Sequence, residues 1–275
     1  MIPLAFEYAP AHSVEEAVAL LAEHGEDAKL LAGGHSLLPL LKLRLAAPSV
    51  LVDVGRLDEL RYVRDEGDEL AIGALARHHD LEASPVVAEH APVLGAAASL
   101  VGDPQVRNRG TIGGSLVHGD AASDLPAVVL ALGGSLVLQG SDGRRRAPAD
   151  EFFVGFLETA VESGEMLVEV RVPKTGATGA HYEKHNRRSQ DYAIVAVAAV
   201  LGAEPRVTLV NMGPTPMRAR GVEDALRAGA GAAAAAAEAA SGTEPLSDQH
   251  ASAEDRAELA RVLVERALVA AGAPA

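Results

Sequence analysis

Two short segments, far apart in the chain, combine a glycine pair with a hydroxyl side chain, and this combination suits phosphate binding. The first glycine segment is Leu30-Leu31-Ala32-Gly33-Gly34-His35-Ser36, and the second is Arg109-Gly110-Thr111-Ile112-Gly113-Gly114-Ser115. Glycine adopts positive φ angles readily and lets a ligand approach the main chain closely. Successive N–H groups that turn inward form an anion-binding concavity, known as a nest. Two matched nests predict a ligand with two phosphates held from both sides, which indicates a dinucleotide.

The common nucleotide-binding motifs do not account for this pattern. The opening βα unit lacks the Gly-x-Gly-x-x-Gly fingerprint of a Rossmann fold, and the chain has no Walker lysine motif. A third glycine pair, Gly133-Gly134, ends a predicted helix and precedes a predicted strand, and we expect it to bind nothing. The predicted dinucleotide therefore requires a different fold.

Polar residues around the glycine segments leave alternatives open. A carboxylate at Asp120 or Asp124 suits the hydroxyls of a ribityl or ribose group, but Asp124 precedes Leu125-Pro126, and the pattern alone favours a helix cap. His78-His79-Asp80 suggests a metal site, yet adjacent helix residues point to different faces, so we predict a solvated surface. No Ser/His/Asp set or metal-ligand spacing stands out, so we predict neither a catalytic residue nor a metal site.

Composition excludes several classes of function. The chain has 275 residues and a net charge of -14, which argues against a nucleic-acid partner because phosphate backbones need a basic surface. It has no cysteine, which excludes disulfides, thiolate nucleophiles and iron–sulfur clusters held by this chain. Residues 1–10 lack a basic region followed by an apolar one, and no apolar stretch is long enough for a bilayer span. We expect a cytoplasmic protein whose only membrane association would come through its partners.

The elements that must position the glycine segments form two predicted units. A capping box at Ser13 opens a helix that ends near Gly25, residues 28–32 form a strand that leads into the first glycine segment, and residues 50–54 form another strand. Beyond residue 57 we predict a hairpin around residues 65–67, helices over 75–83, 86–100 and 125–132, and strands over 135–139 and 166–172.

The last third of the chain has a different pattern. Residues 174–180 form the best linker candidate. Residues 181–184, 192–201 and 206–212 predict an antiparallel meander, although residues 192–201 fit a helix equally well by pattern. Three helices are predicted over residues 222–228, 230–240 and 253–270.

Longer stretches around the glycine segments resemble a known family. The stretches are AGGHSLLPLLKLR (32–44), QVRNRGTIGGSLVHGDAASDLP (105–126) and MGPTPMRA (212–219). They are similar to the FAD-binding medium subunit of molybdenum hydroxylases, the type found in aerobic carbon monoxide dehydrogenase and in the flavin domain of xanthine dehydrogenase. The resemblance runs over nearly the whole chain.

This resemblance implies an α+β fold with three domains. Two α/β FAD-binding subdomains of the vanillyl-alcohol-oxidase (PCMH) type are expected over residues 1–56 and 57–173. A C-terminal flavoprotein domain over residues 174–275 is expected to carry a three-stranded antiparallel sheet and helices. The resemblance also favours a strand over residues 192–201.

The family's binding positions carry over to this sequence. The two loops implied to wrap the FAD pyrophosphate are Ala32, Gly33, Gly34, His35 and Ser36, and Thr111, Ile112, Gly113, Gly114 and Ser115. Asp124 matches an acid that bonds FAD hydroxyls, so the resemblance outweighs the cap. Val101 matches an apolar position beside the adenine, Leu167 and Lys184 match positions near the flavin's pyrimidine edge, and Tyr192 matches a residue close to the isoalloxazine ring. No histidine lies in a context for covalent attachment, so we expect non-covalent FAD.

The resemblance implies an oxidoreductase subunit that transfers electrons. Electrons would reach FAD from a partner small subunit with iron–sulfur clusters, after substrate oxidation at a molybdopterin cofactor in a partner large subunit, with the complex forming a dimer of heterotrimers. FAD would then reduce an external acceptor. Two alternatives are a self-contained flavin oxidoreductase of the same fold superfamily, such as an enolpyruvyl-sugar reductase, and a non-enzymatic dinucleotide-binding module.

Overall fold

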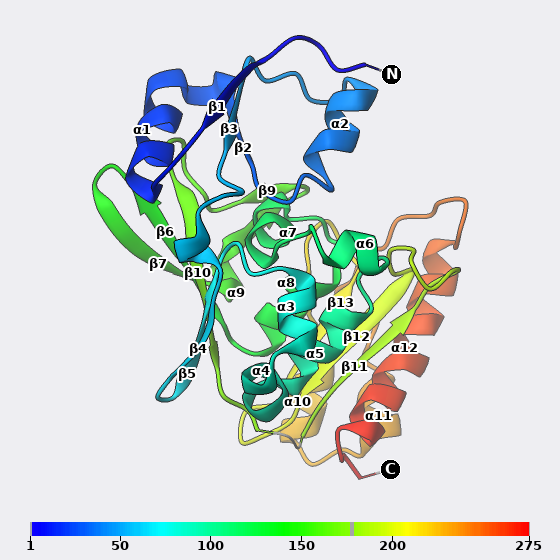
Figure 1. The fold of residues 1–275 in the computed structure, drawn as a ribbon. Coiled ribbons are helices and arrows are strands. Elements are labelled where there is room, and N and C mark those ends of the chain that lie inside the picture. Colours follow the sequence, from blue (N-terminus) through cyan, green and yellow to red (C-terminus); the bar gives the residue numbers. More distant parts are fainter. Residues whose placement is uncertain (1, 177–178, 275) are drawn as a thin grey trace.

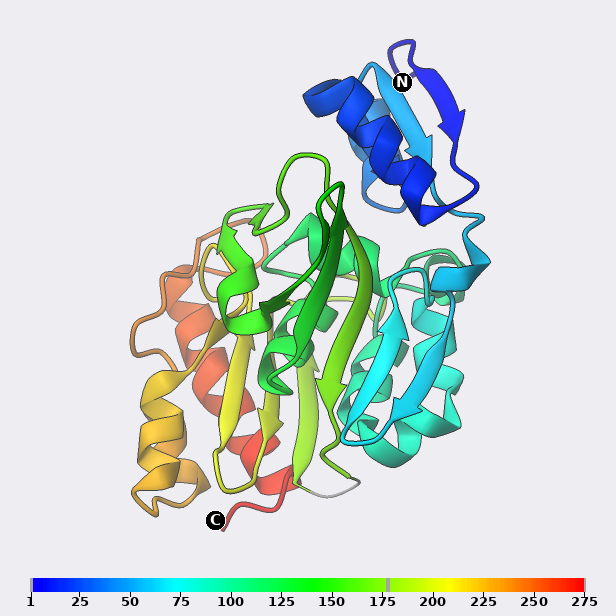
Figure 2. The ribbon, with the colours of Figure 1, turned by 90° about the vertical axis from the view of Figure 1, so that its left-hand side faces the viewer.

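Three main sheets follow one another along the chain in the computed structural model, which describes residues 2–176 and 179–274. The N-terminal unit is a parallel sheet in the order β1-β3-β2, and it stands at one end of the molecule (Figure 2). Ser13 accepts a hydrogen bond from the Glu16 N–H at 3.1 Å and starts helix α1, whose apolar side packs on this sheet. The elements are β1 (Glu7–Pro10), α1 (Val14–His24), a 3₁₀ turn (Gly25–Asp27), β2 (Ala28–Leu31), α2 (Leu37–Leu43) and β3 (Val50–Asp53).

The middle unit is an antiparallel sheet in the order β4-β5-β10-β6-β7. Its helices lie between this sheet and the C-terminal unit (Figure 1), and residues of both sheets and of the helices form the central core. The predicted helix over residues 86–100 is two helices, because Pro92 starts a new one after Ala91. The elements are a 3₁₀ turn (Asp58–Leu60), β4 (Val63–Glu66), β5 (Glu69–Gly73), α3 (His78–Ala83), α4 (Pro85–His90), α5 (Pro92–Ser99), α6 (Pro104–Arg107), α7 (Ile112–His118), α8 (Asp124–Ala131), β6 (Ser135–Gly140), β7 (Gly143–Pro148), α9 (Ala149–Phe152), β8 (Phe153–Gly155), β9 (Glu158–Thr159) and β10 (Met166–Pro173).

The C-terminal unit is an antiparallel sheet in the order β11-β12-β13-β14, with α12 lying against β11 and β12 (Figure 1). The predicted three-stranded meander is present, and the two-residue strand β14 extends it by pairing with β13. The elements are β11 (Ala180–His185), β12 (Val195–Val200), β13 (Arg206–Val210), β14 (Met217–Arg218), α10 (Arg220–Arg227), α11 (Ala232–Ala236) and α12 (Ala253–Ala270).

The burial of strand β12 explains why the sequence pattern of residues 192–201 fitted both a strand and a helix. All of its residues are buried, because one face packs into the central core and the other against the C-terminal helices. A strand buried on both faces has a continuous apolar run instead of alternation, and this run does not distinguish strand from helix. The strand starts at Val195, so Tyr192 lies in the loop before it.

The predicted linker over residues 174–180 connects the middle and C-terminal units. Its first residues are tied back to the middle unit, since Lys174 pairs with Asp65 and the Thr175 N–H donates to the His90 carbonyl at 2.9 Å. Residues 177 and 178 of this prediction lie outside the described residues. Among the residues that the structure describes, no helix combines the length and hydrophobicity needed to span a bilayer.

Candidate cofactor-binding site

A cavity of about 560 Å³ lies where the N-terminal, middle and C-terminal units meet. Its walls come from the loop after β2, the start of α7, the start of α8, strand β10, strand β11 and the loop before β12. All the sequence-predicted binding residues except Ile112 line it. They are Ala32, Gly33, Gly34, His35, Ser36, Val101, Thr111, Gly113, Gly114, Ser115, Asp124, Leu167, Lys184 and Tyr192.

The first glycine segment lies against the second, and its glycines make this possible. A Cβ on Gly33 would lie 2.3 Å from the carbonyl oxygen of Arg109, so only glycine fits. Gly34 has φ of +80°, which turns the chain into α2. Within the described residues, the backbone N–H groups of residues 33–36 have no hydrogen-bond acceptor. Four adjacent free donors beside a cavity make this segment a nest.

The second glycine segment does not form a matching nest. The Ile112 and Gly113 N–H groups donate to the carbonyls of Ala76 and Ala74, both at 2.9 Å. The Gly114 N–H donates to the Thr111 hydroxyl oxygen at 3.1 Å, which caps α7. The prediction of two matched nests is therefore wrong for this segment, because its donors are already used. Its glycines serve close packing, since a Cβ on Gly113 would lie 2.6 Å from the Ala74 carbonyl oxygen.

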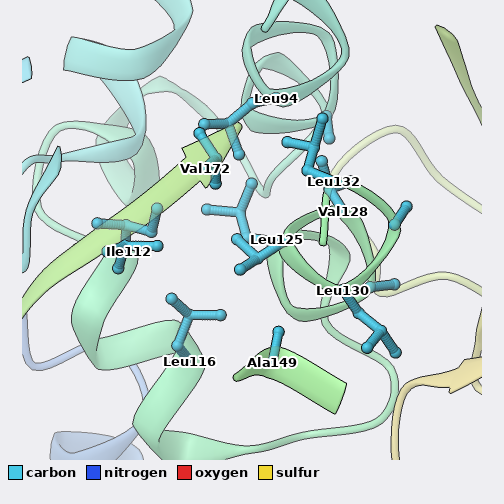
Figure 3. Packing of buried hydrophobic residues seen from close by; sticks show 14 of the residues in the cluster. Leu94, Ile112, Leu116, Leu125, Val128, Leu130, Leu132, Ala149 and Val172 are labelled. Atoms are coloured by element: carbon cyan, nitrogen blue, oxygen red, sulfur yellow. The ribbon is translucent and has the colours of Figure 1, made fainter. Parts of the chain in front are cut away.

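Ile112 belongs to the core instead of the cavity wall. Its side chain is fully buried beside Leu116, Leu125 and Val172 in the central cluster (Figure 3). It anchors the first turn of α7, and in this way holds the second glycine segment in place.

Asp124, Tyr182 and Lys184 form a buried hydrogen-bonded group at the cavity. Lys184 Nζ lies 3.0 Å from Asp124 Oδ2, and the Tyr182 hydroxyl donates to Asp124 Oδ1 at 2.5 Å. Lys184 Nζ also donates to the Leu100 carbonyl at 3.0 Å. Ser123 occupies the N-cap position of α8, so the helix-cap interpretation of Asp124 is wrong. The group joins β11 to α8 and fixes both charged side chains beside the cavity.

Burial and neighbouring charges act in opposite directions on Asp124. Desolvation raises the pKa of its carboxyl above the ordinary value, while Lys184 and the hydrogen bond from Tyr182 counteract this rise. Burial also raises the pKa of Tyr182 well above its ordinary value, so its hydroxyl stays protonated and donating. A carboxylate accepts more than two hydrogen bonds, so Asp124 keeps capacity for a ligand hydroxyl.

His78 lines the cavity, although its sequence pattern predicted a solvated face. Its side chain is buried against Gly110, and within the described residues its Nδ1 atom has no hydrogen-bond partner. Desolvation lowers its pKa to about 4, and the charges of His35 and Arg107 act in the same direction. The sequence does hold a signal for this burial, since His78 precedes the buried Leu81 by one helical turn.

The family is decided by a match over the first two units. A family model described as "FAD binding domain in molybdopterin dehydrogenase" matches residues 4–175. The chain belongs to this family. A second model, "CO dehydrogenase flavoprotein C-terminal domain", matches residues 180–271. The family predicted from the stretches 32–44, 105–126 and 212–219 is therefore confirmed, and FAD is the cofactor of this family.

Members of the FAD-binding family with known names match the whole chain. The carbon monoxide dehydrogenase medium chain of Hydrogenophaga pseudoflava is 46% identical, over 99% of this chain and 99% of that one. The 6-hydroxypseudooxynicotine dehydrogenase complex subunit alpha of Paenarthrobacter nicotinovorans is 41% identical, over 98% of this chain and 96% of that one. In solved structures, carbon monoxide dehydrogenase from Hydrogenophaga pseudoflava matches with a TM-score of 0.94 and 46% identity, over 98% of both chains. Quinoline 2-oxidoreductase from Pseudomonas putida 86 matches with a TM-score of 0.90 and 35% identity, over 98% of both chains.

Replacing Gly34 should weaken FAD binding. In Gly34→Val, a branched side chain must adopt φ of +80° with its Cβ 2.9 Å from Leu38 Cδ1, which distorts the nest. We expect FAD affinity to fall by about tenfold or more, the equivalent of a strain of about 1–2 kcal/mol, measured by fluorescence titration. Gly133→Val is the matched control, since Gly133 has φ of +65° but lies outside the cavity wall. Equal FAD affinity in Gly34→Val and the natural chain would refute the role of the nest.

His78 should make folding stability depend on pH between about 4 and 6.5. Its pKa is about 4 in the folded chain and 6.5 ordinarily, so the unfolded chain binds a proton first as the pH falls. Stability should therefore decrease by up to about 3 kcal/mol as the pH falls through this window. Urea denaturation at fixed FAD concentration should give a shallower pH slope for His78→Gln. The exposed neighbour provides the control, His79→Gln, and identical slopes in all three proteins would contradict the assignment.

Proposed function

We propose that this chain is the FAD-containing electron-transfer subunit of a molybdenum-dependent dehydrogenase complex. The observation that carries the proposal is the cavity, which gathers the main-chain nest, the second glycine segment and the Asp124–Lys184 pair in one place. Supporting it, the first family model covers residues 4–175, which supply most of the cavity wall.

The residues around the cavity suit FAD. The free N–H groups of residues 33–36 would bind the pyrophosphate oxygens, and Thr111, Gly113, Gly114 and Ser115 would form the opposite wall. A Cβ on Gly33 or Gly34 would disturb this cradle. Asp124 would accept hydrogen bonds from FAD hydroxyls, and Val101 would lie beside the adenine. Leu167 and Lys184 would lie at the pyrimidine edge of the flavin and Tyr192 close to its ring.

Bound FAD would supply all the redox chemistry of this chain. The protein's part is to hold and orient it. Lys184 is fixed by Asp124 and Leu100, so its charge has one position beside the cavity. Tyr192 is 58% exposed, so it would cover the flavin from the open side of the cavity.

We infer the partner subunits from the names of the similar chains. The two relatives above are named as a medium chain and as a subunit of a dehydrogenase complex. We infer a small subunit with iron–sulfur clusters and a large subunit with molybdopterin, assembled as a dimer of heterotrimers in the cytoplasm. Exposed apolar side chains offer docking surfaces in two regions. They are Ile2, Leu4, Leu43 and Leu45 in the N-terminal unit and Val154, Phe156 and Leu157 around the β8–β9 hairpin.

The proposed domain division has boundaries at residues 56 and 173. Residues 1–56 contain the parallel sheet, residues 57–173 the five-stranded sheet and residues 174–275 the C-terminal sheet. Each proposed domain therefore holds one main sheet, and FAD would bind where all three meet.

FAD should be released by acid, because the proposed site holds it only through hydrogen bonds and packing. The FAD-loaded chain is precipitated with acid and centrifuged, and the absorbance of the supernatant and of the pellet is measured. We expect the yellow colour in the supernatant. Colour that stays with the pellet would contradict non-covalent binding, and a chain that takes up no FAD would contradict the proposed function itself.

The isolated chain should lack substrate oxidation, because the proposal places that step at the molybdopterin cofactor of the large partner subunit. Co-expression with the neighbouring genes, followed by size-exclusion chromatography and metal analysis, should yield a complex that contains iron and molybdenum. The matched control is the chain expressed alone under the same conditions. A chain that captures no such partner, yet oxidises or reduces a small molecule by itself, would favour the self-contained flavin oxidoreductase.

A further inference from the structure

A second hollow, of about 260 Å³, lies next to the first glycine segment. Basic side chains dominate its polar lining, and we refer to it as the arginine hollow. It is lined by Leu31, Ala32, Gly33, Gly34, Leu38, Asp53, Gly55, Arg56, Arg61, Leu75, Arg77, Arg109 and Thr111. We propose that the arginine hollow binds an oxyanion, a phosphate or carboxylate group, at a site separate from the FAD cavity.

The first argument is that three arginines of the hollow have no ion-pair partner. Within the described residues, the side chains of Arg56, Arg77 and Arg109 have no carboxylate within 4.0 Å and no hydrogen-bond acceptor. Arginines elsewhere, such as Arg44 and Arg187, also have no ion pair there, so what marks this hollow is that three such arginines line it together. They come from three separate segments, after β3, before α3 and before α7. Like charges repel, so an anion held between these guanidinium groups would be bound favourably.

The second argument is that the one carboxylate in the lining pairs with none of these three arginines. Asp53 Oδ1 accepts the Gly55 N–H at 2.8 Å, and Asp53 Oδ2 accepts the Tyr8 hydroxyl at 2.6 Å. Arg61 is likewise held, since its guanidinium donates to Asp58 and to the Gly55 carbonyl. The three remaining guanidinium groups keep their donors for a ligand.

The chemistry of the ligand follows from these donors. Guanidinium groups bind carboxylate and phosphate oxygens through paired, charge-assisted hydrogen bonds. The hollow has room for one such group together with a few waters. Two sources could supply it: a free anion in solution, or an acidic side chain of a partner subunit. Both present the same oxyanion to the same arginines.

The arginine hollow adjoins the proposed FAD cavity but is not part of it. The two share Ala32, Gly33, Gly34, Leu75 and Thr111 as a common wall, and none of the four arginines lines the FAD cavity. An anion in the hollow would therefore neutralise the arginines without displacing FAD. The inference does not depend on the proposed function, because it stands on this chain's own charges.

The test uses the full chain loaded with FAD. Inorganic phosphate is titrated at constant ionic strength, balanced with chloride, and binding is measured by calorimetry. We expect saturable binding that weakens about tenfold in Arg77→Gln and in Arg109→Gln, each of which loses charged hydrogen bonds. Arg144→Gln is the matched control, since Arg144 is exposed like Arg109 and, within the part of the chain that the structure describes, has only Gln139 as a side-chain partner. FAD content should be the same in all four proteins.

Each outcome decides the proposal. Absence of saturable binding, or equal phosphate affinity in the Arg77, Arg109 and control variants, would overturn it. Phosphate that competes with FAD would also overturn it, because the hollow would then be part of the FAD site. Where phosphate binds the isolated chain and the assembled complex alike, the source is a free anion. Where the complex no longer binds phosphate and Arg77→Gln releases a partner about tenfold faster, the source is a partner's acidic side chain.

Discussion

The close contact between Gly33 and the Arg109 carbonyl is the constraint on which the rest of the site depends. No side chain fits between these two stretches of backbone, since a Cβ would lie 2.3 Å from the carbonyl oxygen. The contact brings the N-terminal parallel sheet against the start of α7. Two hollows share the first glycine segment in their lining: the cavity proposed for FAD and the arginine hollow. A larger residue at this position would separate the walls of both.

The two glycine segments differ in whether their backbone N–H groups are available to a ligand. The first keeps its N–H groups free and can bind an anion through the main chain. The N–H groups of the second segment donate to the carbonyls of Ala74 and Ala76 and to the Thr111 hydroxyl. These hydrogen bonds make the segment a rigid wall. This rigidity favours ligand binding, because a wall that is already ordered loses little conformational entropy when a ligand binds. A free nest facing an ordered wall is a preorganised site.

The charged side chains of the proposed FAD cavity differ from those of the arginine hollow. Inside the proposed FAD cavity, Asp124 is matched by Lys184, and burial keeps His78 neutral near pH 7. These groups together add little net charge. Three arginines without an ion pair in the described residues, Arg56, Arg77 and Arg109, line the arginine hollow and not that cavity. Two kinds of group suited to anions thus line neighbouring hollows: main-chain N–H groups in the cavity proposed for FAD and guanidinium groups in the arginine hollow.

The sequence by itself determined the elements whose causes are local. The capping box at Ser13, the strand that leads into the first glycine segment and the long C-terminal helix were predicted from neighbouring residues, and the family was identified from contiguous motifs. Only the tertiary structure decided which donors are free. Ala74 and Ala76 consume the N–H groups of the second segment, and Tyr182 and Lys184 turn Asp124 from a cap into a buried ion pair. His78 became buried through contact with Gly110. In each case the partner is distant in sequence, and no local pattern records which acceptor the folded chain will place within 3 Å of a donor.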